Sequence, residues 1–445
     1  MNEWLPSFCV IASIGVFLVL PTYVKLKWRE HKARKKQEAS IAAGRNEPAS
    51  IRPWVDPKRC MGSGGCVTAC PEKVLGIVHG QATVVAGAKC VGHGACVTAC
   101  PVDAIQLVFG SKRQAIDIPQ RSPGFETNVP GLYVAGELGG MGLIANAIEQ
   151  GVQAADNALN QTAPTQEGVD ILIVGAGPSG VGAALRAIER KASYLLLDQD
   201  EFGGSIRHYP RQKLVMTRPV TLPGYGKLHF KTARKEELIE TLEAAAEKTG
   251  LEVTQGRVES VLPCPEGFLV ATPHEEYLAK RVVLCLGRRG SPRKVGCPGE
   301  DLEKVAYRLI DAEKYSYEHI LVVGAGDSAV EAAVALGEQP GNRVTLSYRG
   351  TKIHRPKEDN LNRLKASEAA GKVTLILGST VGRIDLDRVV LKQGDEEHVL
   401  PNDFVFVFAG GVLPTKLLTH AGIQIQRHQG KQVVAAEAPK ASGGP

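Results

Sequence analysis

The chain is poor in cysteine and carries little excess charge outside its first 38 residues. It has 445 residues, 10 of them cysteine, and a formal net charge of +6. Residues 1–38 hold seven Lys or Arg and three Glu, so most of the excess lies there. The remaining chain is nearly balanced and has no stripe of basic residues of the kind that follows a phosphate backbone. Nucleic acid is therefore excluded as a partner.

Long hydrophobic runs are also scarce, with one exception at the N-terminus. Residues 5–24 carry no charge, and such a run is long enough to cross roughly 30 Å of hydrocarbon as a helix. The basic segment KLKWREHKARKK follows directly, whereas a secretory signal would carry its basic residues in front and a small-residue cleavage site behind. A buried core helix is the alternative, but the run has no polar face. We therefore expect residues 1–36 to form a membrane anchor with one transmembrane helix.

The expected anchor also predicts a location for the protein. Basic residues flank transmembrane helices on the cytoplasmic side, so we expect a single-pass protein of the cell membrane with the bulk of its chain in the cytoplasm. Cytoplasmic thiols stay reduced, which favours metal ligation by the cysteines over disulfides.

Six of the ten cysteines stand in two copies of one pattern. CMGSGGCVTACP covers residues 60–71, and CVGHGACVTACP covers residues 90–101. Two-cluster bacterial ferredoxins carry the run C-x2-C-x2-C-x3-C-P, in which the fourth cysteine serves the other cluster. The repeat resembles such a ferredoxin domain, which we place at residues 52–112, but each copy lacks the second cysteine. Zinc is the alternative, although zinc pairs usually come as C-x2-C.

The resemblance implies a set of ligands for two iron–sulfur clusters. The first cluster site would be held by Cys60, Cys66 and Cys100, and the second cluster site by Cys90, Cys96 and Cys70. Ser63 and His93 occupy the places of the missing cysteines. Either these residues ligate, or water does, or a site carries three irons; we favour 4Fe–4S over 3Fe–4S. Histidine ligation raises the potential of Rieske centres, so His93 would make its cluster easier to reduce.

A first dinucleotide motif follows the linker NQTAPTQEG. An apolar strand leads into the glycines Gly175, Gly177 and Gly180, and a helix and a second apolar strand follow. These glycines allow a tight turn and let backbone N–H groups and the helix N-terminus reach a pyrophosphate. Asp198 ends the second strand, where an acid can bond a ribose hydroxyl. The pattern predicts a dinucleotide site rather than a glycine-rich connection without a ligand.

The motif returns at HILVVGAGDSAVEAAVALGEQPGNRVTLSYRG, with Gly324, Gly326 and Ala329 in the glycine places. Ser347 stands where the first motif has its acid, and Arg349 and Arg355 come just after it. A missing acid with arginines nearby favours a 2′-phosphate, so we expect NADPH here, with NADH as the alternative. The other interpretation is that these arginines are merely a solvated surface.

The segments VGAGPSG, EFGGS, VVLCLGRRGSP, VVGAGDSAVEAA and FVFVFAGG together resemble the thioredoxin-reductase-like flavoproteins, and the variant with SYRG is most similar to bacillithiol disulfide reductase and its relatives. The resemblance implies FAD on the first motif, NADPH on the second, and the glycine pair Gly203 and Gly204 close to the flavin. It implies an α/β fold with two Rossmann-like domains, beside the α+β ferredoxin domain and the transmembrane helix. The expected bounds are 168–290 for the FAD domain, 291–399 for the NAD(P)H domain and 400–430 for a return segment of the FAD domain.

One FAD-domain segment stands in an unexpected place. Such proteins close with T-x-V-P-G-L-Y-x-A-G-D and a helix, but this chain carries TNVPGLYVAGE near residue 130. We expect a circular permutation in which residues 113–160 complete the FAD domain, pack beside residues 405–413, and place Gly136 and Glu137 against the flavin. The helix after Gly142 would point its positive end at the flavin. The alternative is that this segment merely links two domains.

The departure that decides the chemistry is the absence of a C-x2-C pair before the second motif, where thioredoxin reductases carry one. Residues 303–318 contain no cysteine, and Cys264, Cys285 and Cys297 form no close pair. We expect an NAD(P)H:iron–sulfur oxidoreductase that needs no acid, base or nucleophile, only cofactors in place. Its partner would be a membrane-associated or soluble redox protein, with a homodimer left open. The alternatives are a flavin enzyme acting on a bound substrate, as in the glutamate-synthase small subunit, and a non-catalytic redox sensor.

Overall fold

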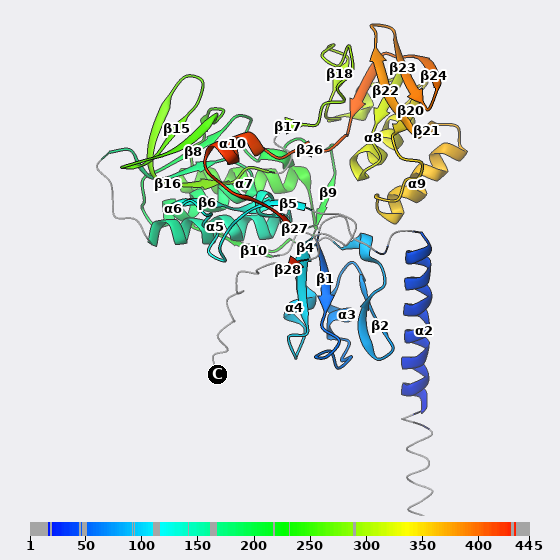
Figure 1. Cartoon of the computed structure of the whole chain (residues 1–445), viewed down its shortest axis with the longest axis horizontal. Helices are drawn as coiled ribbons and strands as arrows, with labels where there is room; N and C mark the ends of the chain where they lie inside the picture. Colours follow the sequence, from blue (N-terminus) through cyan, green and yellow to red (C-terminus); the bar gives the residue numbers. More distant parts are fainter. Residues whose placement is uncertain are drawn as a thin grey trace, which may run out of the picture. The chain divides into compact units, whose positions relative to one another are not determined.

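The computed structural model describes residues 17, 20–43, 46, 51–90, 92, 94–109, 116–140, 142–160, 167–216, 219–230, 232–287, 291–428 and 431–432. The chain forms two compact units (Figure 1). Unit 1 comprises residues 1–116 and 428–433, and unit 2 comprises residues 117–427 and 434–445. The cysteine repeat lies in unit 1, and both glycine motifs lie in unit 2.

Unit 1 is a small α+β fold built around the repeat. Strands β1 (Ile51–Val55), β4 (Ile105–Phe109) and β28 (Lys431–Gln432) form an antiparallel sheet in the order β1-β4-β28. A hairpin, β2 (Leu75–Val78) and β3 (Gln81–Val84), and two short helices, α3 (Gly65–Ala69) and α4 (Ala95–Thr98), complete it. The small core includes Cys66 and Cys96, so the repeat itself supplies part of the packing.

Helix α2 (Leu20–Ala42) lies beside this hairpin (Figure 1). No helix among the described residues is long and apolar enough to cross a membrane. The predicted transmembrane helix over residues 5–24 lies for the most part outside the described residues.

Unit 2 contains a seven-stranded sheet that carries the first glycine motif. Its order is β13 (Thr254–Gln255), β8 (Tyr194–Asp198), β7 (Val169–Val174), β16 (Glu276–Leu284), β15 (Gly267–Ala271) and β14 (Ser260–Cys264), with β6 (Leu132–Val134) also paired to β16. Helices α5 (Ile144–Asn160), α6 (Pro178–Glu189) and α7 (Lys235–Thr249) accompany it. The sheet is mixed, with β14 and β15 antiparallel to their neighbours, and the apolar strand β7 lies in its parallel part, where helices bury it.

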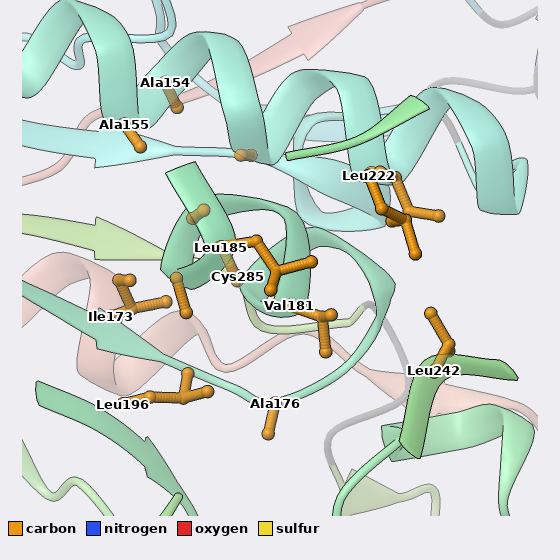
Figure 2. Close-up of a cluster of buried hydrophobic side chains, with 14 of the residues drawn as sticks. Ala154, Ala155, Ile173, Ala176, Val181, Leu185, Leu196, Leu222, Leu242 and Cys285 are labelled. Carbon is orange, nitrogen blue, oxygen red and sulfur yellow. The ribbon is translucent and has the colours of Figure 1, made fainter. Parts of the chain in front are cut away.

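The segment expected to be permuted is part of this sheet. Leu132–Val134 pairs in parallel with Val282–Leu284, and α5 packs against α6. The core in Figure 2 joins Ala154 and Ala155 of α5 to Val181 and Leu185 of α6. Residues 113–160 are therefore not a simple linker, because a strand and a helix from this range form part of the first Rossmann-like layer.

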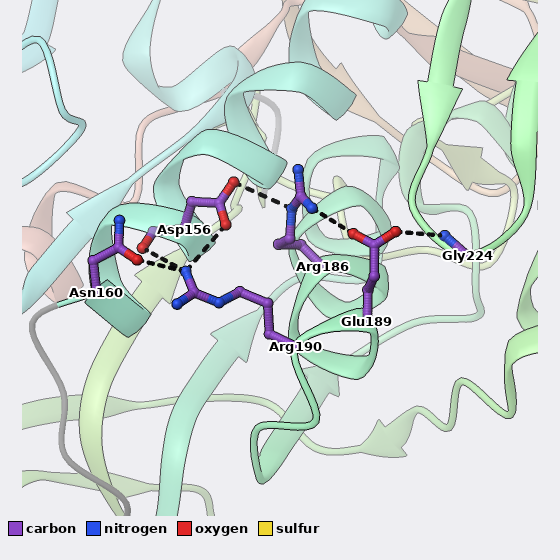
Figure 3. A network of polar contacts seen from close by, with 6 residues as sticks. All are labelled: Asp156, Asn160, Arg186, Glu189, Arg190 and Gly224. Carbon is purple, nitrogen blue, oxygen red and sulfur yellow. Dashed lines mark hydrogen bonds and ion pairs between the residues drawn. The ribbon is translucent and has the colours of Figure 1, made fainter.

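Polar contacts join the same two helices at their far ends (Figure 3). Asp156 of α5 forms an ion pair with Arg186, whose Nε lies 3.2 Å away, and accepts from Arg190 Nη1 at 3.2 Å. Arg190 also donates to Asn160 Oδ1 at 2.6 Å. The α5–α6 pair is thus fixed by an apolar centre and a charged end.

A second parallel sheet carries the second glycine motif. Its order is β18 (Val305–Ala306), β25 (Phe404–Val407), β19 (His319–Val323), β20 (Arg343–Tyr348) and β21 (Val373–Leu377). Helices α8 (Asp327–Gly337) and α9 (Glu358–Ala369) pack with it. A three-stranded sheet of β22 (Ser379–Ile384), β23 (Arg388–Gln393) and β24 (Glu396–Pro401) follows.

The predicted boundary at residue 400 is wrong. Phe404–Val407 pairs with β19 because this apolar run is buried as a strand of the second sheet. Of the predicted neighbours of the permuted segment at 405–413, residues 405–407 belong to the second sheet, whereas Leu413 packs against the cluster that contains Leu132, Val134 and Leu138. Asn128 also bonds the backbone of Gly422 and Gln424, each at 2.8 Å.

The chain returns to the first domain after residue 410. Strand β26 (Gly411–Val412) pairs with β17 (Ser291–Pro292), and α10 (Thr415–His420) follows. Strand β27 (Ile425–His428) then pairs with β5 (Ile116–Pro119). Two antiparallel strand pairs complete unit 2: β9 (Leu214–Met216) with β12 (Thr232–Arg234), and between them in the chain the hairpin of β10 (Val220–Leu222) with β11 (Gly226–Leu228).

Candidate cofactor sites

The first glycine loop joins β7 to α6, as its sequence predicts. A side chain at Gly180 would place its Cβ 1.7 Å from the carbonyl oxygen of Gly175, so only glycine allows the helix to approach the strand this closely. Gly177 has no atom within 4 Å of such a Cβ, which leaves open space over the N-terminus of α6. A pyrophosphate therefore fits over this loop, with backbone N–H groups and the helix end directed at it.

Asp198 stands at the end of β8, beside the loop. One of its carboxylate oxygens accepts from the backbone N–H of Ala176 at 2.5 Å, and the other accepts from that of Asp200 at 2.9 Å. Burial raises the pKa of this carboxyl, and these hydrogen bonds oppose the rise. The predicted ribose-binding acid thus also ties the glycine loop to its strand. Gly204 is a close neighbour, since a Cβ there would lie 2.9 Å from the Cα of Gly177, and Gly203 bonds Ala176 through its backbone N–H at 3.0 Å.

The permuted segment lies at the same loop. Gly136 begins a turn after β6, and a Cβ on it would lie 2.8 Å from that of Ser179, in the first turn of α6. Its N–H donates to Gln150 Oε1 at 3.1 Å. Glu137 and Gly142 line the cleft that the loop borders, and α5 begins two residues after Gly142. The structure therefore brings residues 136–144 to the loop at 175–180.

Both glycine loops border one cleft of about 1430 Å³ within unit 2. Gly175 and Gly177 line it from the first domain, and Gly324, Gly326 and Ala329 line it from the second. Gly326, like Gly177, has no atom within 4 Å of a built Cβ. The cleft is larger than a pocket for one drug-sized ligand, which is about 300–1,000 Å³, so it has room for two dinucleotides.

The second loop carries no acid after its second strand. Ser347 is buried and its hydroxyl shares a 2.8 Å hydrogen bond with that of Ser379. Arg349 and Arg355 line the cleft, and neither forms an ion pair with any of the described residues. Two unpaired guanidinium groups beside the loop are suited to a phosphate.

Sequence reasoning missed the residue that holds the segment with Arg349 and Arg355 in place. Asp327, the first residue of α8, accepts from the backbone N–H of Lys357 at 2.8 Å and from Asn360 Nδ2 at 2.7 Å. These bonds tie residues 349–357 to the glycine loop. The contact pairs residues about 30 positions apart, so no local pattern indicates it.

A second missed group stands where thioredoxin reductases carry their dithiol. Tyr307 and Arg308 line the cleft there, and Arg308 contacts His208 Nε2 at 2.9 Å and Asp200 at 3.7 Å. Burial and the nearby Arg308 charge lower the pKa of His208. No cysteine lies in this segment, and Cys264, Cys285 and Cys297 are free thiols.

The structure gathers the repeat cysteines into two groups of three. One cavity is lined by Cys60, Ser63, Cys66 and Cys100, and another by Cys70, Cys90 and Cys96. Backbone N–H groups point at three of the sulfurs. In the first group, Ala82 donates to Cys60 Sγ at 3.4 Å and Ala104 donates to Cys100 Sγ at 3.2 Å. In the second group, Val74 donates to Cys70 Sγ at 3.4 Å. Such bonds stabilise thiolate ligands and tune cluster potential.

These cysteines are poor thiolates without a metal. Burial raises the pKa of Cys90 to about 11 and that of Cys96 to about 12, with further rises from neighbouring cysteines. A bound iron–sulfur cluster supplies the positive charge that such ligands need. No three acidic, His or Cys side chains among the described residues are close enough to share one metal ion, whereas a cluster binds each cysteine to a different iron. His93 lies outside the described residues.

Comparison with known proteins agrees with both the nucleotide-binding fold and the cluster sites. Residues 172–440 match the model of the pyridine nucleotide-disulphide oxidoreductase family, and residues 52–101 match that of the 4Fe-4S dicluster domain.

The match to this chain covers most of the length of several relatives. Bacilliredoxin reductase Bdr of Bacillus subtilis is 27% identical over 268 residues, 58% of this chain and 82% of that protein. A ferredoxin–NADP reductase of Streptococcus gordonii is 28% identical over 271 residues, 58% of this chain and 79% of that protein. The solved bacillithiol disulfide reductase of Bacillus cereus has a TM-score of 0.52 at 25% identity, over 58% of this chain and 82% of that one. The chain belongs to the pyridine nucleotide-disulphide oxidoreductase family, as a flavin oxidoreductase for FAD, NADP and iron–sulfur clusters with a 4Fe-4S dicluster domain on its N-terminal side.

Proposed function

We propose that this protein moves electrons between NADPH, FAD and its two iron–sulfur clusters, to or from a redox partner at the membrane. The observation that carries the proposal is that two dinucleotide loops share one cleft with no dithiol in it, in a chain that has its own dicluster domain. The ferredoxin–NADP reductases among its relatives act, by their name, between a ferredoxin and NADP. Here a ferredoxin-like domain is part of the same chain.

The residues of the chain bind and orient rather than react. The first glycine loop, Asp198, Gly203, Gly204 and the segment at Gly136 and Glu137 would hold FAD. The second loop would hold the nicotinamide cofactor, and the two groups of three cysteines would hold the clusters. When bound, the flavin supplies the exchange between a two-electron hydride and single electrons.

The preference for NADPH is supported by charge. Arg349 and Arg355 line the cleft without ion-pair partners among the described residues, and Asp327 holds their segment to the glycine loop. Ser347 leaves no carboxylate that would repel a 2′-phosphate.

Attachment to the membrane is supported by the sequence and by one exposed side chain of α2. The uncharged run of residues 5–24 includes the first five residues of α2, and the N-terminal half of the helix then carries Lys25, Lys27 and Arg29. Exposed Trp28, a residue type enriched at membrane interfaces, stands in this half.

Anaerobic reduction tests the electron route directly. Protein loaded with FAD and clusters is mixed with NADPH, and cluster reduction is followed by low-temperature EPR. We expect NADPH to reduce the clusters, and iron rather than zinc in metal analysis. Dithionite reduction serves as the control that the clusters can accept electrons. If NADPH reduced the flavin while the clusters stayed oxidised, the route would not exist, and a flavin enzyme acting on a bound substrate would be favoured.

A matched variant separates NADPH binding from the rest. Gly326→Val places a side chain in open space at the second loop, so the fold and the other cofactors should persist while NADPH reduction is lost. Steady turnover of NADPH with an artificial one-electron acceptor distinguishes an enzyme from a redox sensor, since a sensor would not turn over.

A further inference from the structure

Within unit 1, helix α2 contacts the hairpin along strand β2, and the contacts follow a fixed order. Glu30 Oε1 accepts from the backbone N–H of His79 at 2.7 Å. One turn further along α2, Ala33 lies close to Gly76. A Cβ added to Gly76 would lie 2.9 Å from the Cβ of Ala33. After another turn, Lys36 Nζ donates to the carbonyl of Lys73 at 2.9 Å. The helix therefore runs antiparallel to β2, beside which it lies in Figure 1.

The two ends of the same hairpin contact different cluster sites. At its turn, a side chain at Gly62 would lie 2.1 Å from the carbonyl oxygen of Gly80, and Ala82 N–H points at Cys60 Sγ. The turn therefore belongs to the first cluster site. At the other end, Val74 N–H points at Cys70 Sγ, a residue of the second cluster site.

The direction of α2 thus gives an order to the clusters. Toward the N-terminus of α2 the helix meets the hairpin turn and the first cluster site, and toward its C-terminus it meets the strand end beside the second. Glu30 and Lys36 are about 9 Å apart along the axis, at 1.5 Å per residue. The uncharged run of residues 5–24 stands on the N-terminal side.

We infer that the cluster held by Cys60, Cys66 and Cys100 is the membrane-proximal one and that the cluster of Cys70, Cys90 and Cys96 is membrane-distal. This order rests on the proposed membrane attachment. The loop beside the proximal site is open to solvent, with Met61 68% exposed and Gly80 at the exposed hairpin turn. Because electron transfer slows steeply with distance, this loop is the surface that a redox protein held in the membrane would approach.

The order is tested by EPR on the full-length holoprotein in vesicles that contain a gadolinium-labelled lipid headgroup. Cys96→Ser removes a ligand of the distal cluster and leaves the proximal one, and Cys66→Ser does the reverse. Gadolinium shortens the relaxation of nearby paramagnets. We expect it to raise the half-saturation power of the reduced cluster strongly in Cys96→Ser and weakly or not at all in Cys66→Ser. The reverse pattern, or equal effects, would overturn the order.

A second measurement covers the case in which a ligand variant fails to fold. A fluorescent amino acid replaces Met61 near the proximal site or Glu72 near the distal one, in otherwise unchanged protein. We expect more energy transfer to headgroup acceptors from position 61 than from position 72, and the opposite ranking would refute the order. Sedimentation with vesicles distinguishes a failure of the proposed membrane attachment from a failure of the cluster order. A full-length protein that stays in the supernatant would overturn membrane attachment and the order with it, whereas a bound protein with the wrong ranking overturns the order alone.

Discussion

Single residues distinguish the two nucleotide loops of this chain. After the second strand of each motif the first domain has Asp198, whose oxygens accept two backbone hydrogen bonds, and the second has the buried Ser347. Two positions further on, the first domain has Asp200 and the second has Arg349. The two loops thus share one backbone fold, but a negatively charged side chain stands beside the first loop and positively charged side chains stand beside the second.

Arg349→Ala should weaken NADPH binding more than NADH binding. Loss of one charge-assisted hydrogen bond to the 2′-phosphate costs about 1.5–3 kcal/mol, which is roughly 10- to 100-fold in Kd. NADH lacks this phosphate, so its Kd should change little. Calorimetric titration of the FAD-loaded protein measures both constants, with the exposed Arg363→Ala on α9 as the control. Equal losses for both nucleotides would show that Arg349 does not recognise the phosphate.

Acid should weaken a cleft-lining loop through Glu300. This buried carboxylate accepts from Tyr307 OH at 2.7 Å and from the backbone N–H of Gly296 at 2.7 Å and of Val295. Burial raises the pKa of Glu300, but these hydrogen bonds together lower it by more than burial raises it. The pKa of Glu300 in the folded protein therefore lies below its ordinary value of 4.5. A lowered folded-state pKa gives stability that is present above 4.5 and is lost as pH falls through the folded value.

We therefore expect the melting temperature of wild type to fall below about pH 4.5 and this dependence to be smaller in Glu300→Gln. Tyr307→Phe removes one hydrogen bond and should cost about 1 kcal/mol at neutral pH. Scanning calorimetry across pH measures both effects. A Glu300→Gln variant with the same acid profile as wild type would assign the loss of stability to other groups.

The residues that sequence reasoning found and missed differ in a physical way. Arg349 and Arg355 stand at a fixed place in a local motif, so spacing alone indicates them. Asp327 and Arg308 act through contacts made about 30 and 100 positions away, at Lys357 and His208, and no spacing records such pairs.

Among the elements, helices α5 and α6 form the closest pair in unit 2. A side chain at Gly151 of α5 would place its Cβ 1.8 Å from the carbonyl oxygen of Ser179 in α6, and one at Gly182 would lie 2.4 Å from that of Ile148. Each helix thus offers a glycine where the other helix's backbone passes. This contact holds the permuted segment against the loop at 175–180.

Gly151→Ala should be destabilising although alanine is the better helix former. In an open helix the change would stabilise by about 1 kcal/mol. Here the methyl group meets backbone, so the helices must move apart at a cost of about 1–3 kcal/mol. We expect a lower melting temperature and a lower FAD content after purification. Gln153→Ala, partly exposed on the same helix, is the control, and a stabilised Gly151→Ala would show that the close contact is absent in solution.

Periodicity and turn residues predict the strands and helices that flank each glycine motif, because those segments are apolar runs ending in glycine. The strand Phe404–Val407 belongs to the second sheet and not to the expected return segment, because an apolar run shows that a strand is buried without showing in which sheet. Strand β28 escapes prediction altogether, since two residues, Lys431–Gln432, form it by pairing with β4 far earlier in the chain.

At the scale of the whole molecule, α2 has two neighbours along its length. Its first five residues belong to the uncharged run, and its middle part contacts the hairpin through Glu30, Ala33 and Lys36. The two parts should therefore be separable by truncation. One cut removes the expected anchor alone, and a longer cut also removes the support of the clusters.

Deletion of residues 1–24 should release the protein from washed membranes as a soluble, yellow-brown species with full iron content, because every described α2–hairpin contact remains. Deletion of residues 1–42 should also release it, but with faster loss of iron to a chelator, because β2 then loses Glu30 and Lys36 at its two ends. Fractionation, FAD and iron analysis, and the rate of chelation measure these outcomes. A protein that stayed membrane-bound without residues 1–24 would place the anchor elsewhere. Equal chelation rates for the two truncations would show that α2 does not support the clusters, while leaving the role of residues 5–24 as anchor intact.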